Sequence, residues 1–233
     1  MFLAHLVGDY ILQTDELAAW KSKSALGVLV HCLVVAVTTF LFAFVYGSGN
    51  GQWWMSALII SLAHTAIDLI QLPISSVTNR GMLALARFLG DQTLHFASIV
   101  AAITFGGYIS DAGFFATMAA EIANYPILAY CLAYTSLAMP AWVWLEFFGY
   151  GIAEKSPPNF ANATNKYISS LERWLIATCV LLGQYFLIPV VAAPRVYLEK
   201  KYLSANQTGH LYIIKLLASV GLALGVGLAL KQM

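Results

Sequence analysis

The sequence predicts an all-α fold, a polytopic transmembrane helix bundle that forms a single integral membrane domain over residues 1–233. Of these residues 60% are hydrophobic and only 10% are charged, whereas roughly a quarter are charged in a typical soluble domain. Apolar runs of about 20 residues, the length that crosses a bilayer as a helix, recur along the chain. The formal net charge of +1 leaves no basic surface for a nucleic-acid backbone, so we expect the lipid bilayer and no nucleic acid as a partner.

We predict six full spans and one short partial span. The full spans are expected at residues 25–46, 53–72, 81–105, 126–148, 172–193 and 211–230. The stretch from Phe2 to Gln13 is apolar but too short to cross, and Thr14 with two acids after it is typical of a helix start. This stretch has neither the basic leader nor the cleavage site of a signal peptide, so we expect it to be retained as a partial span.

Basic residues fall in alternate predicted loops, which we expect to be cytoplasmic. They are Lys21 and Lys23, Arg80, and Lys155 with Lys166. The fifth predicted span brings a conflict with this rule. If residues 172–193 cross completely, Arg195, Lys200 and Lys201 lie outside. Lys231 would then lie inside, so the sequence leaves the orientation of the last third open.

Residues near the ends of the later spans have expected structural roles. Pro140 should kink the span that contains it. Trp142 and Trp144 are expected to act as interfacial anchors rather than to form a binding cage. Gly221 and Gly225 form a GxxxG spacing, which allows close helix contact either within the chain or in a homo-oligomer.

Three His/Asp pairs inside apolar segments are the most informative feature for function. The pairs are His5 with Asp9, His64 with Asp68, and Asp91 with His95, each separated by four residues. An ionisable side chain in the hydrocarbon core costs at least about 2.5 kcal/mol, and such residues normally face the bundle interior and mark function. Residues four apart share a helix face, so each pair can offer a nitrogen and an oxygen to one ion. A single pair is explained by an interhelical hydrogen bond, but three together predict a metal site.

The pairs and His31, which has no carboxylate four residues on, are expected at overlapping depths. At a rise of about 1.5 Å per residue they lie roughly 8 to 22 Å into the membrane. These seven candidates exceed the four ligands of one zinc ion, so we expect one or two divalent ions, with Zn²⁺ first and Mn²⁺ or Fe²⁺ as alternatives. Cys32, Cys131 and Cys179 lie singly in apolar runs and are interpreted as packing residues.

A centre of this kind favours hydrolysis, because it lowers the pKa of a bound water and stabilises both oxygens of a displacement. The six residues of the pairs are the candidate metal ligands. The general base is expected to be either His31 or whichever of the carboxylates is not a ligand. Those carboxylates are Asp9, Asp68 and Asp91.

Five further residues are candidates for orienting the ligands or binding substrate: Gln13, Arg87, Gln92, Glu172 and Arg173. The two glutamines flank the pairs and are expected to orient ligands. Arg87 shares a face with Asp91, where it either pairs with that carboxylate, holds a phosphate or carboxylate, or snorkels to the interface. Glu172 and Arg173 open a later span and either approach the site or pair with each other.

The motifs also resemble a known family. The stretch HLVGDYILQTD from His5, the pair His64 to Asp68, and DQTLH from Asp91 resemble an uncharacterised family of bacterial polytopic membrane proteins, a domain of unknown function. The stretch ERWLI from Glu172 is similar to a later segment of that family. The resemblance implies a bacterial inner-membrane location. The pattern is also distantly similar to predicted membrane-bound metal-dependent hydrolases, a likeness by analogy only.

The leading hypothesis is a membrane-embedded metal-dependent hydrolase that acts near the cytoplasmic side on a lipid-like or small-molecule ester, amide or phosphoester. The alternative is a proton- or cation-coupled transporter, because intramembrane Asp and His also form proton relays. Repeats would favour transport, but the ionisable residues gather in residues 1–100 without a counterpart in the spans of 126–230. A third hypothesis is a structural scaffold whose polar cluster locks the helices together.

Overall fold

The computed structural model describes residues 1–47, 49, 51–77, 81–152, 165–198 and 209–233, and within these ranges every regular element is a helix. Among the predicted loop residues, Arg80, Lys155, Lys200 and Lys201 lie outside the described residues. The all-α prediction is confirmed.

Five segments are long and apolar enough to span a membrane: 25–47, 53–74, 81–105, 126–152 and 211–231. They correspond to α3 (Ala25–Gly47), α4 (Trp53–Val77), α5 (Gly81–Phe105), the pair α7 (Pro126–Leu137) and α8 (Met139–Ile152), and α12 (Gly209–Lys231). Five of the six predicted spans are therefore confirmed, and the chain is an integral membrane protein. A short helix, α6 (Phe114–Asn124), joins α5 to α7.

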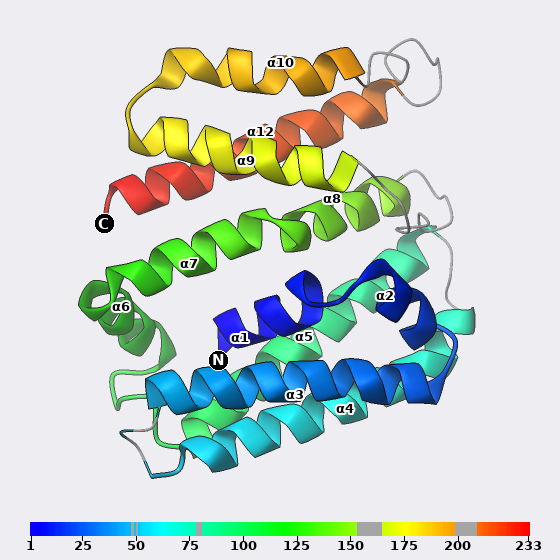
Figure 1. The fold of residues 1–233 in the computed structure, drawn as a ribbon, viewed down its shortest axis with the longest axis vertical. Helices are drawn as coiled ribbons and strands as arrows, with labels where there is room; N and C mark the ends of the chain where they lie inside the picture. The colour runs from blue at the N-terminus through cyan, green and yellow to red at the C-terminus, as the bar shows by residue number, and fades with distance from the viewer. Residues whose placement is uncertain (48, 50, 78–80, 153–164, 199–208) are drawn as a thin grey trace.

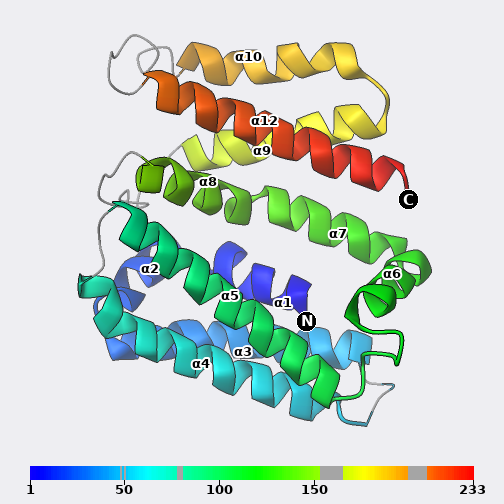
Figure 2. The ribbon, with the colours of Figure 1, turned by 180° about the vertical axis from the view of Figure 1, so that it is seen from behind.

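The helices form two groups stacked along the long axis of the molecule (Figure 1). One group contains α3, α4 and α5, and the other contains α9 (Asn165–Leu181), α10 (Ile188–Leu198) and α12. The α7–α8 segment lies between them, and α8 packs against both α5 and α12 (Figure 2). One end of the bundle carries the junction of α2 and α3, the start of α9 and the start of α12 (Figure 1). We call it the α2/α3 end.

The first residues fold into the interior of the bundle. α1 (Phe2–Leu6) continues into one π-helical turn, η1 (Val7–Ile11), and together they form an apolar segment too short to span. Gly8 allows this segment to approach α3 closely, because a Cβ there would lie 3.0 Å from the Cα of Val35. Thr14 then caps α2 (Asp15–Lys21) by accepting a hydrogen bond from the amide of Leu17. The predicted partial span and helix start are confirmed.

The fourth span is broken where the sequence predicted a kink. α7 ends at Leu137 and α8 begins at Met139, because Pro140 has no amide hydrogen and its ring obstructs the preceding turn. The prediction that Trp142 is an interfacial anchor is wrong, and that for Trp144 stays a prediction. Trp142 is 4% exposed in the core, and Trp144 is half-buried and lines a cavity.

The fifth predicted span, 172–193, is not one helix. α9 ends at Leu181, the chain reverses at Gly183 with a φ of 70°, and α10 returns along α9. Only glycine adopts this φ without strain, so the turn depends on it. The hairpin resolves the conflict between the fifth predicted span and the expected side of the basic residues. Arg195 lies in α10, and α10 runs back toward the α2/α3 end, where α9 begins (Figure 1).

The glycines of α12 have different surroundings. Gly227 packs against α9, because a Cβ there would lie 2.9 Å from the Cβ of Val180. Gly221 and Gly225 face open space. The close contact within the chain is therefore made by Gly227, two residues beyond the GxxxG pair. Contact with a second copy through that pair stays a prediction.

Candidate metal centre

The seven residues that the sequence singled out for the metal site meet in one place, which we call the His/Asp cluster. Its members are His5 from α1, Asp9 from η1, His31 from α3, His64 and Asp68 from α4, and Asp91 and His95 from α5. His31 is fully buried, and His64 and His95 are each 2% exposed. The cluster is therefore enclosed by the helices that carry it.

Four side chains of the cluster, those of Asp9, His31, His64 and Asp68, have potential ligand atoms close to one another. Nε2 of His31 lies 3.0 Å from Oδ1 of Asp9 and 3.3 Å from Nε2 of His64. Oδ2 of Asp68 lies 3.5 Å from Nε2 of His31 and 3.3 Å from Nε2 of His64. Nε2 of His64 lies 4.0 Å from Oδ1 of Asp9. Tetrahedral zinc with bonds of about 2.0–2.1 Å separates its ligand atoms by about 3.3 Å, so the atoms of His31, His64 and Asp68 match three positions around one zinc-sized ion. Asp9, His31 and His64 form an overlapping group of three.

Asp68 also faces a second set of ligand atoms. Its Oδ1 lies 3.8 Å from Nε2 of His95, a buried nitrogen without a hydrogen-bond partner among the described residues. Nδ1 of His95 lies 3.0 Å from the backbone oxygen of Asp91, the kind of contact that orients a ligating imidazole. Asp68, Asp91 and His95 offer ligand atoms within 4.8 Å of one another. Asp68 is thus positioned between two potential ion sites.

His5 lies at the edge of the cluster. Its Nε2 is 3.8 Å from Oδ2 of Asp9, and its ring stacks on His95 with 5.3 Å between the centroids. The same side chain lines the apolar cavity described below. His5 therefore borders both the candidate ligands and a space that a substrate can occupy.

Lys21 is part of the cluster, although the sequence placed it in a loop. Its Nζ lies 2.8 Å from Oδ2 of Asp68 and 3.8 Å from Oδ1 of Asp9. Burial by itself would lower the pKa of Lys21, but the carboxylates of Asp9 and Asp68 outweigh that effect and raise the pKa above its ordinary value. The single charge of this ammonium offsets part of the negative charge of the two carboxylates, from the α2/α3 end of the cluster.

Sequence reasoning also missed Cys32, which was interpreted as a packing residue. Its Sγ lies 3.6 Å from Oδ2 of Asp68, and it forms a third potential ligand group with His64 and Asp68. The signal was available, because Cys32 follows His31 in the same buried helix. No spacing motif marks it, however, since its partners come from another helix.

The predicted supporting residues divide into two groups. Gln92 donates a hydrogen bond to Oδ2 of Asp91 at 3.0 Å and accepts one from the hydroxyl of Tyr10 at 2.7 Å. Gln13 and Arg87 line a polar cavity beside Asp68 and Asp91. These three residues adjoin the cluster in the structure.

The other two predicted supporting residues, Glu172 and Arg173, lie in α9 on the far side of α7 and α8 from the cluster (Figure 1). Arg173 is fully buried and donates to the backbone oxygens of Leu137 and Ala138 at 2.6 and 2.8 Å. Glu172 lies 3.6 Å from Arg195 of α10. The first alternative, an approach to the site, does not hold, because their contacts secure the second helix group and the break between α7 and α8.

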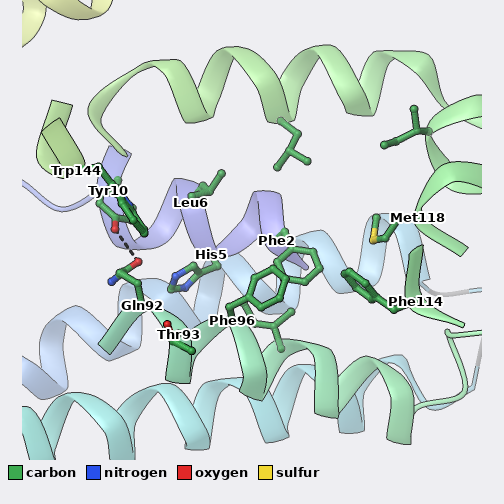
Figure 3. Close-up of a pocket in the computed structure, with 13 residues that line it drawn as sticks. Phe2, His5, Leu6, Tyr10, Gln92, Thr93, Phe96, Phe114, Met118 and Trp144 are labelled. Atoms are coloured by element: carbon green, nitrogen blue, oxygen red, sulfur yellow. Dashed lines mark hydrogen bonds between the residues drawn. The ribbon is translucent and has the colours of Figure 1, made fainter. Parts of the chain in front are cut away.

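Two cavities adjoin the cluster. The apolar cavity, of about 560 Å³, extends from Tyr10 and Trp144 past His5 to Phe114 and Met118 of α6 (Figure 3). The polar cavity, of about 270 Å³, is bordered by side chains that include Lys21, Gln71 and Arg87. A volume of several hundred cubic ångströms is typical of small-molecule sites.

Comparison with known proteins identifies a family. Residues 1–121, slightly more than half of the chain, match the family described as Protein of unknown function (DUF3307). The chain belongs to this family, so the predicted membership of an uncharacterised family is confirmed. The matched residues contain the whole His/Asp cluster. No curated protein and no solved structure matches the chain.

Proposed function

We propose that this protein is a membrane-embedded metal-dependent hydrolase that acts on a lipid-like ester, amide or phosphoester. The observation that supports it best is the close approach of potential ligand atoms of His31 and His64 to each other and to those of Asp9 and Asp68, at separations of 3.0 to 4.0 Å. Buried carboxylates and imidazoles are costly in a membrane protein unless they serve a function. Zn²⁺ suits this mixed ligand set best, with Mn²⁺ or Fe²⁺ as alternatives.

The charges of the cluster favour at least one divalent cation. With its imidazoles neutral, the cluster has three carboxylates, of Asp9, Asp68 and Asp91, against the positive charges of Lys21 and Arg87. The net charge of these groups is therefore −1. One divalent ion changes it to +1, and a second ion beside Asp91 and His95 would raise it to +3. The first ion is therefore expected to bind more tightly than the second.

The roles of His5 and His31 follow from their positions. His31 is fully buried among three other ligand atoms, so we assign it to metal binding rather than to proton transfer. His5 borders the apolar cavity and approaches Asp9, so we assign it to proton transfer. A divalent ion held by the cluster would supply activation of water and stabilise the developing oxyanion.

The proposed reaction is hydrolysis, in which one water molecule is consumed for each substrate bond that is cleaved. The oxygen of one water forms a bond to the carbonyl carbon or the phosphorus of the substrate while the bond to the leaving group breaks. His5 accepts a proton from the attacking water and can return it to the departing oxygen or nitrogen. Tyr10 and Gln92, joined by a hydrogen bond of 2.7 Å, hold Asp91 beside this reaction.

We place the α2/α3 end of the bundle in the cytoplasm of a bacterium, with the helices in the inner membrane. Lys21 and Lys23 lie at this end, and Lys166 at the start of α9 lies there too (Figure 1). Positively charged residues are retained on the cytoplasmic side of bacterial membrane proteins. The cluster would then open to the cytoplasmic half of the membrane through the polar cavity.

The first test is to measure metal in the purified protein by elemental mass spectrometry. Wild type should contain near-stoichiometric metal, and Asp68→Ala and the His64→Ala, His95→Ala double variant should lose it. Asp111→Ala is a matched control outside the cluster and should retain it. A well-folded wild type that neither carries nor rebinds a divalent ion would contradict the proposal.

The second test separates hydrolysis from transport. Metal-loaded wild type should cleave chromogenic esters, amides or phosphodiesters that carry an alkyl chain, and chelation should abolish this cleavage. Full activity in metal-free protein would overturn the metal-dependent mechanism. Uptake of protons or metal ions into proteoliposomes without turnover would favour a transporter instead.

A further inference from the structure

We propose that the ammonium of Lys21 has two binding positions, and that it leaves Asp68 for the polar cavity when a divalent ion binds to the His/Asp cluster. In this role Lys21 is a positioning residue that sets the affinity of the cluster for metal. This role rests on the proposed function because it requires a metal ion in the cluster, but it does not require hydrolysis.

The first position of the ammonium is beside the carboxylate atoms that face the candidate ligands. Nζ of Lys21 lies 2.8 Å from Oδ2 of Asp68. The same oxygen lies 3.3 Å from Nε2 of His64 and 3.5 Å from Nε2 of His31. Nζ is also 3.8 Å from Oδ1 of Asp9, which approaches His31 at 3.0 Å. The ammonium and a metal ion would therefore bind to the same carboxylate oxygens.

An ammonium in this position opposes the binding of a divalent ion. A carboxylate oxygen lies about 2.0–2.2 Å from the zinc it binds, so an ion on Oδ2 of Asp68 would lie within about 5 Å of Nζ of Lys21. At that distance, the repulsion between the charges in a buried site is several times the thermal energy. Tight binding of the ion therefore requires the ammonium to move away.

The side chain of Lys21 has space in which to move. It is 24% exposed, and it borders the polar cavity of about 270 Å³. A lysine carries its charge on a flexible four-carbon chain with three donors that can rotate. Lys21 is the last residue of α2, a helix without buried residues, so its side chain can turn without repacking a core.

The polar cavity has the acceptors that a displaced ammonium needs. Oε1 of Gln13, Oε1 of Gln71 and Oδ1 of Asp91 are buried and have no hydrogen-bond partner among the residues that the structure describes, and all three residues border this cavity. Buried acceptors are almost always satisfied in native proteins, and three oxygens match the three N–H donors of an ammonium. Arg87 borders the cavity too, but Asp91, four residues further along α5, offsets its charge.

The two positions keep the buried charges paired whether or not an ion is bound. Without an ion, the ammonium offsets the carboxylates of Asp9 and Asp68, which would be costly to bury unpaired. With an ion, the metal takes over that role and the cavity oxygens hold the ammonium. Because Asp91 is one of those acceptors, the displaced ammonium also disfavours a second ion beside it.

The test is the affinity of the purified full-length protein for Zn²⁺, measured in detergent by competition with a chromophoric chelator. Lys21→Met removes the ammonium but keeps a flexible chain, so it should tighten Zn²⁺ binding at least roughly ten-fold. Lys23→Met is the matched control, since Lys23 is an exposed residue of the same segment, and it should change the affinity by less than roughly two-fold. A Zn²⁺ affinity of Lys21→Met equal to that of wild type would contradict the competition.

A further variant distinguishes movement into the polar cavity from repulsion alone. Gln71→Leu removes one acceptor of the displaced ammonium, so it should weaken Zn²⁺ binding roughly ten-fold, as expected for a hydrogen bond to a charged group. The same change in the Lys21→Met protein should leave the Zn²⁺ affinity unchanged, because no ammonium is displaced there. Equal weakening by Gln71→Leu in both proteins, or weakening in neither, would overturn the second position of Lys21.

Thermal unfolding without metal checks the state of Gln71 before the ammonium moves. Its Oε1 has no hydrogen-bond partner among the described residues, so replacing this side chain with a hydrocarbon should leave the unfolding temperature unchanged or raise it. A marked fall would show that this oxygen is already bonded when no metal is present. That result would overturn its role as an acceptor for Lys21.

The metal centre, the movement of Lys21 and the hydrolysis can fail separately. Absence of Zn²⁺ binding in both wild type and Lys21→Met would overturn the metal centre and this role with it. Zn²⁺ binding that does not depend on Lys21 would retain the metal centre and overturn the role. An affinity that depends on Lys21 and Gln71 as expected, in a protein that cleaves no ester, amide or phosphodiester, would retain the role and overturn the hydrolase.

Discussion

Two buried groups of charged residues, the His/Asp cluster and the arginines of α9 and α10, differ in how their polar atoms are used. All three side-chain nitrogens of Arg173 donate hydrogen bonds, to two backbone oxygens and to the hydroxyls of Ser170 and Ser219. In the cluster, Nδ1 of His31 and Nε2 of His95 are buried without such partners. Buried polar groups whose hydrogen bonds are satisfied hold helices together, whereas a cluster of buried polar groups with unsatisfied atoms indicates a ligand.

The largest effect on stability is expected for Arg173→Ala. This change leaves the backbone oxygens of Leu137 and Ala138 without their buried donors at the break between α7 and α8. The loss should be about 3 kcal/mol, since each unsatisfied buried acceptor costs on the order of 1–3 kcal/mol. Thermal unfolding in detergent measures it. The metal content per folded molecule should stay unchanged, and a loss of metal would show that the two groups are coupled.

A smaller loss is expected for Gly27→Ala. A Cβ at Gly27 would lie 2.5 Å from the carbonyl carbon of Trp20 and 2.7 Å from the amide nitrogen of Lys21, so α2 must move away from α3. Overpacking of this kind costs about 1–3 kcal/mol, and it should also displace Lys21 from the cluster. Gly221→Ala is the control in open space and should be neutral or slightly stabilising. Equal unfolding temperatures for both variants would contradict this packing.

Gly8→Ala should have a milder effect on stability and a specific effect on metal. The new Cβ would lie 3.0 Å from the Cα of Val35, so η1 must shift by a few tenths of an ångström. We expect a loss of about 1 kcal/mol, together with weaker metal binding because Asp9 moves with η1. Titration of the metal-free protein with Zn²⁺ measures the affinity. A Zn²⁺ affinity equal to that of wild type would show that metal binding by Asp9 does not depend on the close contact between Gly8 and Val35.

The smallest effect on stability is expected for Asp68→Asn in metal-free protein. The change removes one of three neighbouring carboxylates, which relieves repulsion, but it also removes the partner of Lys21 at 2.8 Å. These effects oppose each other, so the unfolding temperature should shift by no more than the equivalent of about 1 kcal/mol. Metal binding should nevertheless be lost. A loss of stability as large as that of Arg173→Ala would mean that the cluster is a structural scaffold.

The sequence predicted the parts of this protein that depend on local spacing. Residues four apart on a helix necessarily share a face, so the pairs His64/Asp68 and Asp91/His95 were recognisable before the helices were assembled. Long apolar runs likewise defined α3, α4, α5 and α12. Both signals lie within one helix, where rise and periodicity are fixed.

Features that depend on contacts between helices were not predictable in the same way. Lys21 reaches Asp68 because α2 folds back against α3 at Gly27, and nothing in the sequence of α2 specifies that contact. The hairpin at Gly183 was missed because the apolar run 172–193 continues through it. A hydropathy pattern does not distinguish a buried turn from a continuous helix.

The hairpin of α9 and α10 also determines on which face of the membrane a reporter fused to the chain would be exposed. Because α10 returns toward the end at which α9 starts, α12 begins at the α2/α3 end and carries Met233 to the opposite end (Figure 1). A reporter enzyme fused to the C-terminus would therefore be exposed on the opposite face of the membrane from one inserted between Ser22 and Ser24.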